Sequence, residues 1–187
     1  MFKNIVLITV LFLFSVSIQA QETKPKSADI IMKIAMKQSK ASHKNIMVMF
    51  HASWCSWCKR LDKAMQSPEL KQIFEENFVI THLDVLERKG KIDSLENAGG
   101  QDLMKTYGGE KAGLPFCVIV DKSGKMIANS NAMPEKSNIG YPGSKEEVDL
   151  FVKLLKSGSK KLSKEKAAKI TDYFIKNAPK QAGSASN

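Results

Sequence analysis

The chain has 187 residues, enough for one domain with a hydrophobic core and short extensions. Its apolar fraction of 43% is ordinary for a globular protein and excludes a chain that is disordered throughout. The formal net charge is +10, but the basic residues are dispersed and form no long run interleaved with aromatic side chains. The sequence therefore predicts a solvated basic surface and no nucleic-acid partner.

Residues 1–20 differ in character from the rest of the chain. A basic start at Lys3 is followed by an apolar run and then by smaller residues that end in Ala20. This is the layout of a secretory signal peptide. A retained transmembrane anchor is less favoured, because the apolar run is shorter than the span of about 20 residues that a membrane helix needs. We expect cleavage near Ala20, a mature protein that does not span a membrane, and a periplasmic or secreted location.

A polar lead and a helix follow this segment. Residues 21–27 are polar, and Ser27 is a favourable N-cap with Asp29 in the first helical turn. Apolar residues then recur at helical spacing, which predicts that one face of the helix packs against the core. This predicted face is formed by Ile30, Ile31, Ile34 and Ala35.

Beyond residue 45, short apolar runs alternate with amphipathic segments. The short runs predict buried strands, and turn residues and caps mark the boundaries, as in the capping box of Ser144 and Glu147. The predicted elements are a strand at 46–50, a helix at 56–66, a new helix start at Ser67 and Pro68, a strand at 78–85, a helix at 102–107, strands at 116–120 and 125–128, a helix from 144 that ends at Gly158, and a helix from about 163.

Early alternation of helices and strands followed by a late hairpin predicts an α/β fold. Its central mixed sheet is flanked by helices on both faces. The domain covers residues 28–157, a C-terminal helical extension covers 158–177, and a disordered tail covers 178–187.

Cys55 and Cys58 are separated by two residues at a predicted helix start, directly after the strand at 46–50. Free backbone N–H groups and the helix dipole favour a negative charge there, which lowers the pKa of the first thiol and makes it nucleophilic. The second thiol, one turn on, can attack a mixed disulfide. We therefore predict that Cys55 is the nucleophile and Cys58 the resolving thiol, with positive charge added by Lys59 and Arg60.

Other chemistries use the same spacing of two cysteines. A zinc site needs further ligands, and although His51 and His82 are available, no second ligand pair stands at finger-like spacing. Covalent haem attachment needs His after the second cysteine, where this chain has Lys59. A purely structural disulfide would close a very small loop and constrain the unfolded chain little. The redox role is favoured over zinc binding and over an inert disulfide, with no cofactor beyond the cysteine pair.

The segment Phe-His-Ala-Ser-Trp-Cys-Ser-Trp-Cys-Lys at 50–59 resembles the active-site segment of the thioredoxin superfamily. Its Trp-Cys-x-Trp-Cys-Lys form is similar to a branch of exported bacterial thioredoxin-like proteins and to the periplasmic thioredoxin-like domain of transmembrane disulfide reductases. The resemblance covers residues 28–156 and includes the restart at 67–70, Tyr-Gly-Gly at 107–109 and Gly-Leu-Pro-Phe at 113–116. It implies a thioredoxin fold.

The resemblance also implies a substrate-docking site. In this family the proline that corresponds to Pro115 is cis and faces the cysteine pair, and the residue before it pairs with an extended substrate. Leu114 and Pro115 are therefore expected to dock the substrate. Trp54 and Trp57 flank the cysteines, where they form an apolar platform for protein substrates or pack within the fold.

One position departs from the family pattern. Thioredoxins proper carry a buried acid that assists proton transfer at the resolving cysteine, and the matching residue here is Met49. Proton transfer would then come from water, His51, His82 or a lysine. The third cysteine, Cys117, lies in a predicted apolar strand and is expected to be a buried core thiol.

Together these observations predict an exported thiol–disulfide oxidoreductase that acts on protein substrates as a reductase. It would depend on an upstream redox partner, for which a membrane reductase is a candidate. Two alternatives stay open: an oxidase or isomerase, and a non-catalytic binding module that uses Leu114, Pro115 and the tryptophans as a docking groove. The presence of both cysteines favours catalysis over the binding module.

Overall fold

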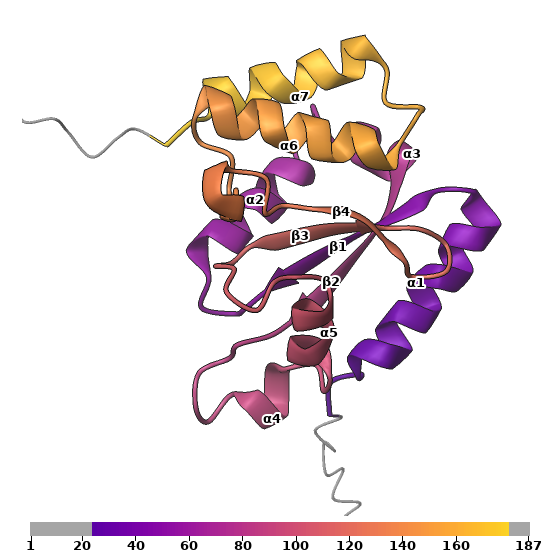
Figure 1. The fold of residues 1–187 in the computed structure, drawn as a ribbon, viewed down its shortest axis with the longest axis vertical. Helices are drawn as coiled ribbons and strands as arrows, with labels where there is room; N and C mark the ends of the chain where they lie inside the picture. The colour runs from indigo at the N-terminus through magenta and orange to yellow at the C-terminus, as the bar shows by residue number, and fades with distance from the viewer. Residues whose placement is uncertain (1–23, 180–187) are drawn as a thin grey trace, which may run out of the picture.

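The computed structural model describes residues 24–179, whose four strands form one mixed sheet (Figure 1). The strand order is β2-β1-β3-β4, with β1 parallel to β2, β3 antiparallel to β1 and β4 antiparallel to β3. The predicted signal peptide at 1–20, residues 21–23 of the lead and residues 180–187 of the tail lie outside the described residues. Within 24–179, no helix has the length and apolar character needed to cross a membrane. The strands are β1 (Asn45–His51), β2 (Phe78–Asp84), β3 (Phe116–Val120) and β4 (Met126–Asn129).

The central strand β1 is buried on both faces. Its residues from Ile46 to Phe50 are inaccessible to solvent, which explains why they are continuously apolar. Successive side chains point to opposite faces, so Met47 and Met49 belong to one half of the core, and Ile46, Val48 and Phe50 belong to the other.

Four helices cover the face on which Met47 and Met49 lie. One of them, α6, begins with the predicted capping box, in which Ser144 Oγ accepts from the Glu147 N–H and the Glu147 carboxylate accepts from the Ser144 N–H. The last helix, α7, lies along α6 and is the predicted C-terminal helical extension (Figure 1). The four helices are α2 (Ser56–Met65), α3 (Lys71–Asn77), α6 (Lys145–Gly158) and α7 (Lys164–Lys176).

The opposite face is covered by α1 (Ala28–Ser42) and α5 (Gly100–Thr106). As predicted, Ser27 caps α1, and its Oγ accepts a hydrogen bond from the Ile30 N–H. The fold therefore has the sheet between two helical layers, as expected for the predicted α/β class.

The predicted apolar face of α1 is wrong for its large residues. Ile30 and Ile34 are 48% and 42% exposed, and of the four predicted residues Ala35 alone is fully buried. Small side chains let the helix lie close to the sheet, and this close approach outweighs the size of the isoleucines. The residues that α1 buries are Ala28, Met32, Ala35 and Ser39.

Two other local expectations differ from the structure. No helix begins at Ser67 and Pro68, because residues 67–70 form a turn and α3 begins at Lys71. The Ser67 hydroxyl is buried and has no hydrogen-bond partner in the described part of the chain. Two short helices were not predicted, since three or four residues carry no periodic pattern. These are α4 (Ile92–Leu95) and the 3₁₀ helix η1 (Pro134–Lys136).

Candidate active site

The cysteine pair lies where β1 passes into α2. Because β1 ends at His51 and α2 begins at Ser56, Cys55 is the N-cap residue of the helix. Its Sγ accepts a hydrogen bond of 3.1 Å from the backbone N–H of Cys58. The two cysteines are joined as a disulfide, with their Cα atoms 5.3 Å apart. After reduction, a Cys55 thiolate at this N-cap is favoured by the free N–H groups and the dipole of α2.

The cis-proline loop lies against the cysteine pair. The peptide bond between Leu114 and Pro115 is cis, as the resemblance implies. Leu114 packs against a buried cluster of Ala52, Cys55 and Cys58. Both cysteines are enclosed, with Cys55 4% and Cys58 1% exposed. The structure therefore brings the predicted docking residue Leu114 into contact with the predicted redox pair.

Three hydrogen bonds to the segment after β2 hold the loop that carries the cysteines. The buried carboxylate of Glu87 accepts hydrogen bonds from the Ser53 N–H at 2.5 Å and from the Ser53 hydroxyl at 2.7 Å. The Leu86 carbonyl accepts a 2.8 Å hydrogen bond from Trp54 Nε1. The sequence analysis missed Glu87 because it lies 34 residues from Ser53 and no spacing pattern links the two.

The tryptophans that precede the two cysteines form a half-exposed rim, with Trp54 44% and Trp57 46% exposed. The Trp57 ring lies 5.7 Å from that of Tyr141, centroid to centroid. The Arg60 guanidinium lies over both rings, at 5.8 and 4.9 Å, and donates a 2.8 Å hydrogen bond to the Asn177 carbonyl. This cation, which the sequence placed beside the thiolate, thus connects the rim to the end of α7.

Met49 is fully buried and lies beside His82 of β2 in the parallel register. His82 Nε2 lies 3.2 Å from the Asp62 Oδ1 of α2, and Asp62 follows Cys58 by about one helical turn. The ring of His51 lies 5.2 Å from that of His82. An imidazole–carboxylate pair and a second imidazole therefore lie near the residue that replaces the acid of thioredoxins.

His51 and Asp84 form a partly buried pair at the ends of β1 and β2, with Nε2 and Oδ1 3.4 Å apart. Burial lowers the pKa of His51, although the Asp84 carboxylate opposes this effect. Burial also raises the pKa of Asp84 above its usual value. His51 is therefore neutral at pH 7, and its buried Nε2 makes no hydrogen bond within residues 24–179.

Cys117 is a free thiol buried in β3. Burial raises its pKa to about 12. It therefore stays protonated and unreactive at neutral pH, in agreement with its interpretation as a core thiol. Across residues 24–179, no group of three or more His, Cys, Asp or Glu side chains is arranged to hold a metal ion.

Three of the solved structures that match this chain show how far the similarity extends. A disulphide isomerase from Xylella fastidiosa Temecula1 is 23% identical over 80% of this chain and 90% of its own, with a TM-score of 0.48. The DsbH oxidoreductase is 27% identical over 65% of this chain and 79% of its own, with a TM-score of 0.45. A thioredoxin-fold protein from Helicobacter pylori is 22% identical over 72% of this chain and 83% of its own, with a TM-score of 0.40. No curated protein matches significantly.

The sequence-family model described as thioredoxin-like matches residues 32–122. The matched region contains β1, β2 and β3, the helix that carries both cysteines, and the cis-proline loop. These are the elements that the sequence resemblance implies, in the order and pairing that the structure shows. On this match and this topology, the chain has a thioredoxin-like fold.

Proposed function

We propose that this protein exchanges disulfides with protein substrates through Cys55 and Cys58, and that it acts as a reductase. The observation that carries the proposal is the N-cap position of Cys55, whose Sγ accepts from the Cys58 N–H while Leu114 packs against the pair. A thiolate is favoured there by the helix, and a partner can approach it along the cis-proline loop.

The exchange proceeds in two balanced steps. The Cys55 thiolate attacks one sulfur of the substrate disulfide, the substrate S–S bond breaks, and one substrate thiolate leaves. The Cys58 thiol then loses its proton and attacks Cys55 Sγ, which releases the second substrate thiolate and forms the Cys55–Cys58 disulfide. Two electrons have then passed to the substrate, and a thiol reductant, the proposed upstream partner, is needed to regenerate the dithiol.

The contacts of Cys55 support the reducing direction. In the described part of the chain, Sγ accepts one hydrogen bond, and the Arg60 guanidinium is engaged by two aromatic rings and a carbonyl. Oxidising members of this superfamily owe their potential to a strongly stabilised reduced form. Since one hydrogen bond reaches Cys55 Sγ and Arg60 is engaged elsewhere, we expect a reduction potential nearer to about −270 mV than to about −120 mV in a glutathione buffer. A reduction potential near about −120 mV would indicate an oxidase.

Trapping of the mixed disulfide tests the exchange itself. Cys58→Ser should accumulate covalent complexes with disulfide-containing proteins, because attack is possible and resolution is not. These complexes should disappear in Cys55→Ser. Complexes that persist in Cys55→Ser and disappear in Cys58→Ser would reverse the roles, and complexes in neither variant would favour a non-catalytic binding module.

We also propose that the protein acts outside the cytoplasm, in the periplasm or as a secreted protein. The support is the charged start, apolar run and small residues before Gln21. Mass analysis of the exported protein should find its N-terminus near Gln21. A chain that keeps residues 1–20 would be tethered to the membrane.

A further inference from the structure

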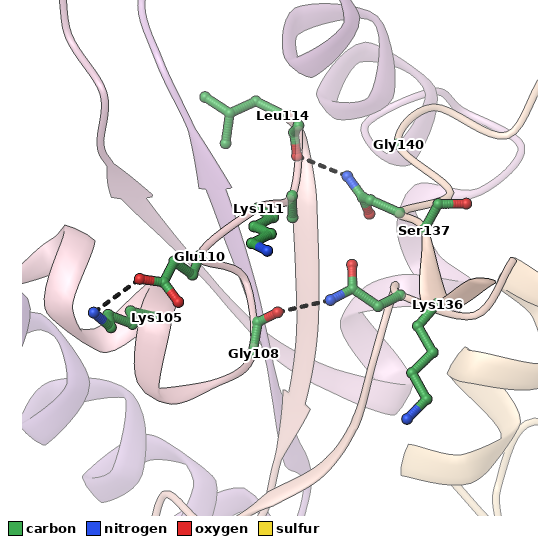
Figure 2. A pocket seen from close by; sticks show the side chains of 12 residues that line it. Lys105, Gly108, Glu110, Lys111, Leu114, Lys136, Ser137 and Gly140 are labelled. Carbon is green, nitrogen blue, oxygen red and sulfur yellow. Dashed lines mark hydrogen bonds and ion pairs between the residues drawn. The ribbon is translucent and has the colours of Figure 1, made fainter.

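Two hollows are connected to the cysteine pair through single lining residues: Leu114, which packs against the pair, and Lys59, which follows Cys58. The first, the Leu114 hollow, has a volume of about 700 Å³ and lies beside the cis-proline loop (Figure 2). The second, the Tyr141 hollow, has a volume of about 420 Å³ and is lined by Lys59, which directly follows Cys58. Gly140 lines the first and the next residue, Tyr141, lines the second, so one short segment separates the two hollows.

The Leu114 hollow carries an excess of positive charge. Three lysines line it, and its single acidic lining residue, Glu110, is paired with Lys105 at 2.8 Å (Figure 2). The other two are Lys111, between α5 and β3, and Lys136, at the end of η1. Both are exposed and form no ion pair with any residue in 24–179. Their ammonium groups are therefore free to bind a ligand.

Three backbone carbonyls around this hollow are already hydrogen-bonded. Asn131 Nδ2 donates to the Gly108 carbonyl at 2.7 Å (Figure 2). Asn138 Nδ2 donates to the carbonyls of Gly113 at 2.7 Å and Pro115 at 2.9 Å. Because donors already occupy these acceptors, the charge that the hollow offers to a ligand is that of its two unpaired lysines.

The Tyr141 hollow has the same sign of charge. Lys59, Arg60 and Lys63 of α2 line it, and none of its lining residues is acidic. Lys59 and Lys63 are exposed and form no ion pair with the described residues. A molecule that docks along Leu114 and reaches Tyr141 therefore meets unpaired cations in both hollows.

We propose that the protein substrate carries acidic residues on both sides of its reactive cysteine, and that these residues occupy the two hollows. This inference rests on the proposed disulfide exchange. An extended peptide spans about 3.3–3.6 Å per residue, so side chains a few residues from the substrate cysteine reach away from the exchange site on either side. Opposite charges at such an interface raise the association rate and exclude basic partners.

The test uses three peptides of equal length, each with one cysteine joined to 2-mercaptoethanol and flanked by Asp and Glu, by Ser, or by Lys. The rate constant of reduction by the dithiol protein is measured at several salt concentrations. The acidic peptide should react about tenfold faster than the Lys peptide at low salt. This advantage should shrink as added salt screens the charges.

Charge-reversed variants locate the effect. Lys111→Glu combined with Lys136→Glu should remove the preference for the acidic peptide over the Ser peptide, so that the ratio of the two rate constants falls to about one. Lys63→Glu should lower this ratio independently. The matched control is Lys37→Glu combined with Lys122→Glu, which changes the net charge equally. Lys37 lies exposed on α1 and Lys122 lies exposed in the turn between β3 and β4, at the end of the sheet away from the cysteine pair. This control variant should have the same ratio of rate constants as the native protein.

The outcomes separate this inference from the function on which it rests. Equal reduction of all three peptides, or an equal loss of preference in the control, would overturn the acidic-substrate inference and leave the disulfide exchange intact. No reduction of any peptide would contradict the exchange itself. Binding of the native protein to anionic phospholipid vesicles without peptide preference would assign the cations to a membrane surface and would also overturn the inference.

Discussion

The carboxylate of Glu87 holds the loop that precedes the cysteine pair through its two hydrogen bonds with Ser53. Replacing it by Gln puts an N–H₂ group or a weaker acceptor against the two Ser53 donors. Hydrogen bonds to charged groups contribute about 1.5–3 kcal/mol, so Glu87→Gln should lower the free energy of unfolding by that order. The rate of disulfide exchange should fall as well, because the loop is no longer fixed. Chemical denaturation and peptide reduction measure the two effects.

Glu75→Gln is the matched control for this change. It removes a carboxylate that pairs with Lys71 on the surface of α3, where an ion pair contributes at most about 1 kcal/mol. Equal losses of stability and rate in the two variants would show that Glu87 does not position the loop.

We predict that resolution of the mixed disulfide is slower than attack, because Met49 stands where thioredoxins have a buried acid. Met49→Asp should speed the decay of a mixed disulfide, at a cost of a few kcal/mol for burying the carboxyl group. Met47→Asp is the control, since it buries the same group on the same face two residues earlier. Stopped-flow measurements on folded protein compare the variants. If neither accelerates resolution, the proton is already handled, and His82 and His51 are the groups to replace next.

Burial of His51 predicts a dependence of stability on pH. Because its pKa is lowered in the folded state, the neutral side chain contributes its full stability above the unfolded value of 6.5, and this contribution is lost as the pH falls. Asp84, His82, Asp62 and Glu87 are the charged or titratable groups that act on it. His51→Gln should therefore flatten the loss of unfolding free energy between pH 6.5 and 5, by at most about 1.4 kcal/mol per pH unit. Equal slopes for both proteins would contradict this.

Among the elements, α7 connects the C-terminal extension to the rim of the site. Phe174 of α7 is fully buried and lies 5.6 Å from the ring of Tyr141, which in turn stacks on Trp57. Phe174→Ala should lower the free energy of unfolding by about 3–5 kcal/mol. It should also change the fluorescence of Trp57, because the stack loses its support.

Ile175→Ala on the same helix is the control for Phe174→Ala, since Ile175 is largely exposed. It should cost little stability and leave the fluorescence unchanged. If the two variants behave alike, α7 is not coupled to the rim.

At the scale of the whole molecule, local sequence patterns predicted most of the helices and strands. They did not predict the contacts between residues that lie far apart in the sequence. The strands, the capping box of α6 and the cysteine pair follow from short sequence windows, and the cis-proline partner of the pair followed from the family resemblance. The buried face of α1 did not, because the fit of small side chains against the sheet decides it. The contacts of Glu87 with Ser53 and of Arg60 with Asn177 join residues 34 and 117 positions apart, which no local spacing signals.

The position of β1 between β2 and β3 also orders the folding of the chain during synthesis. β1, α2, α3 and β2 are complete at Asp84 and can pair as a parallel unit, whereas β3 begins only at Phe116. Until then the second edge of β1 has no partner, and its apolar residues offer a template for pairing with another chain. A nascent chain that ends between these two points therefore presents an unpaired apolar strand edge to other chains.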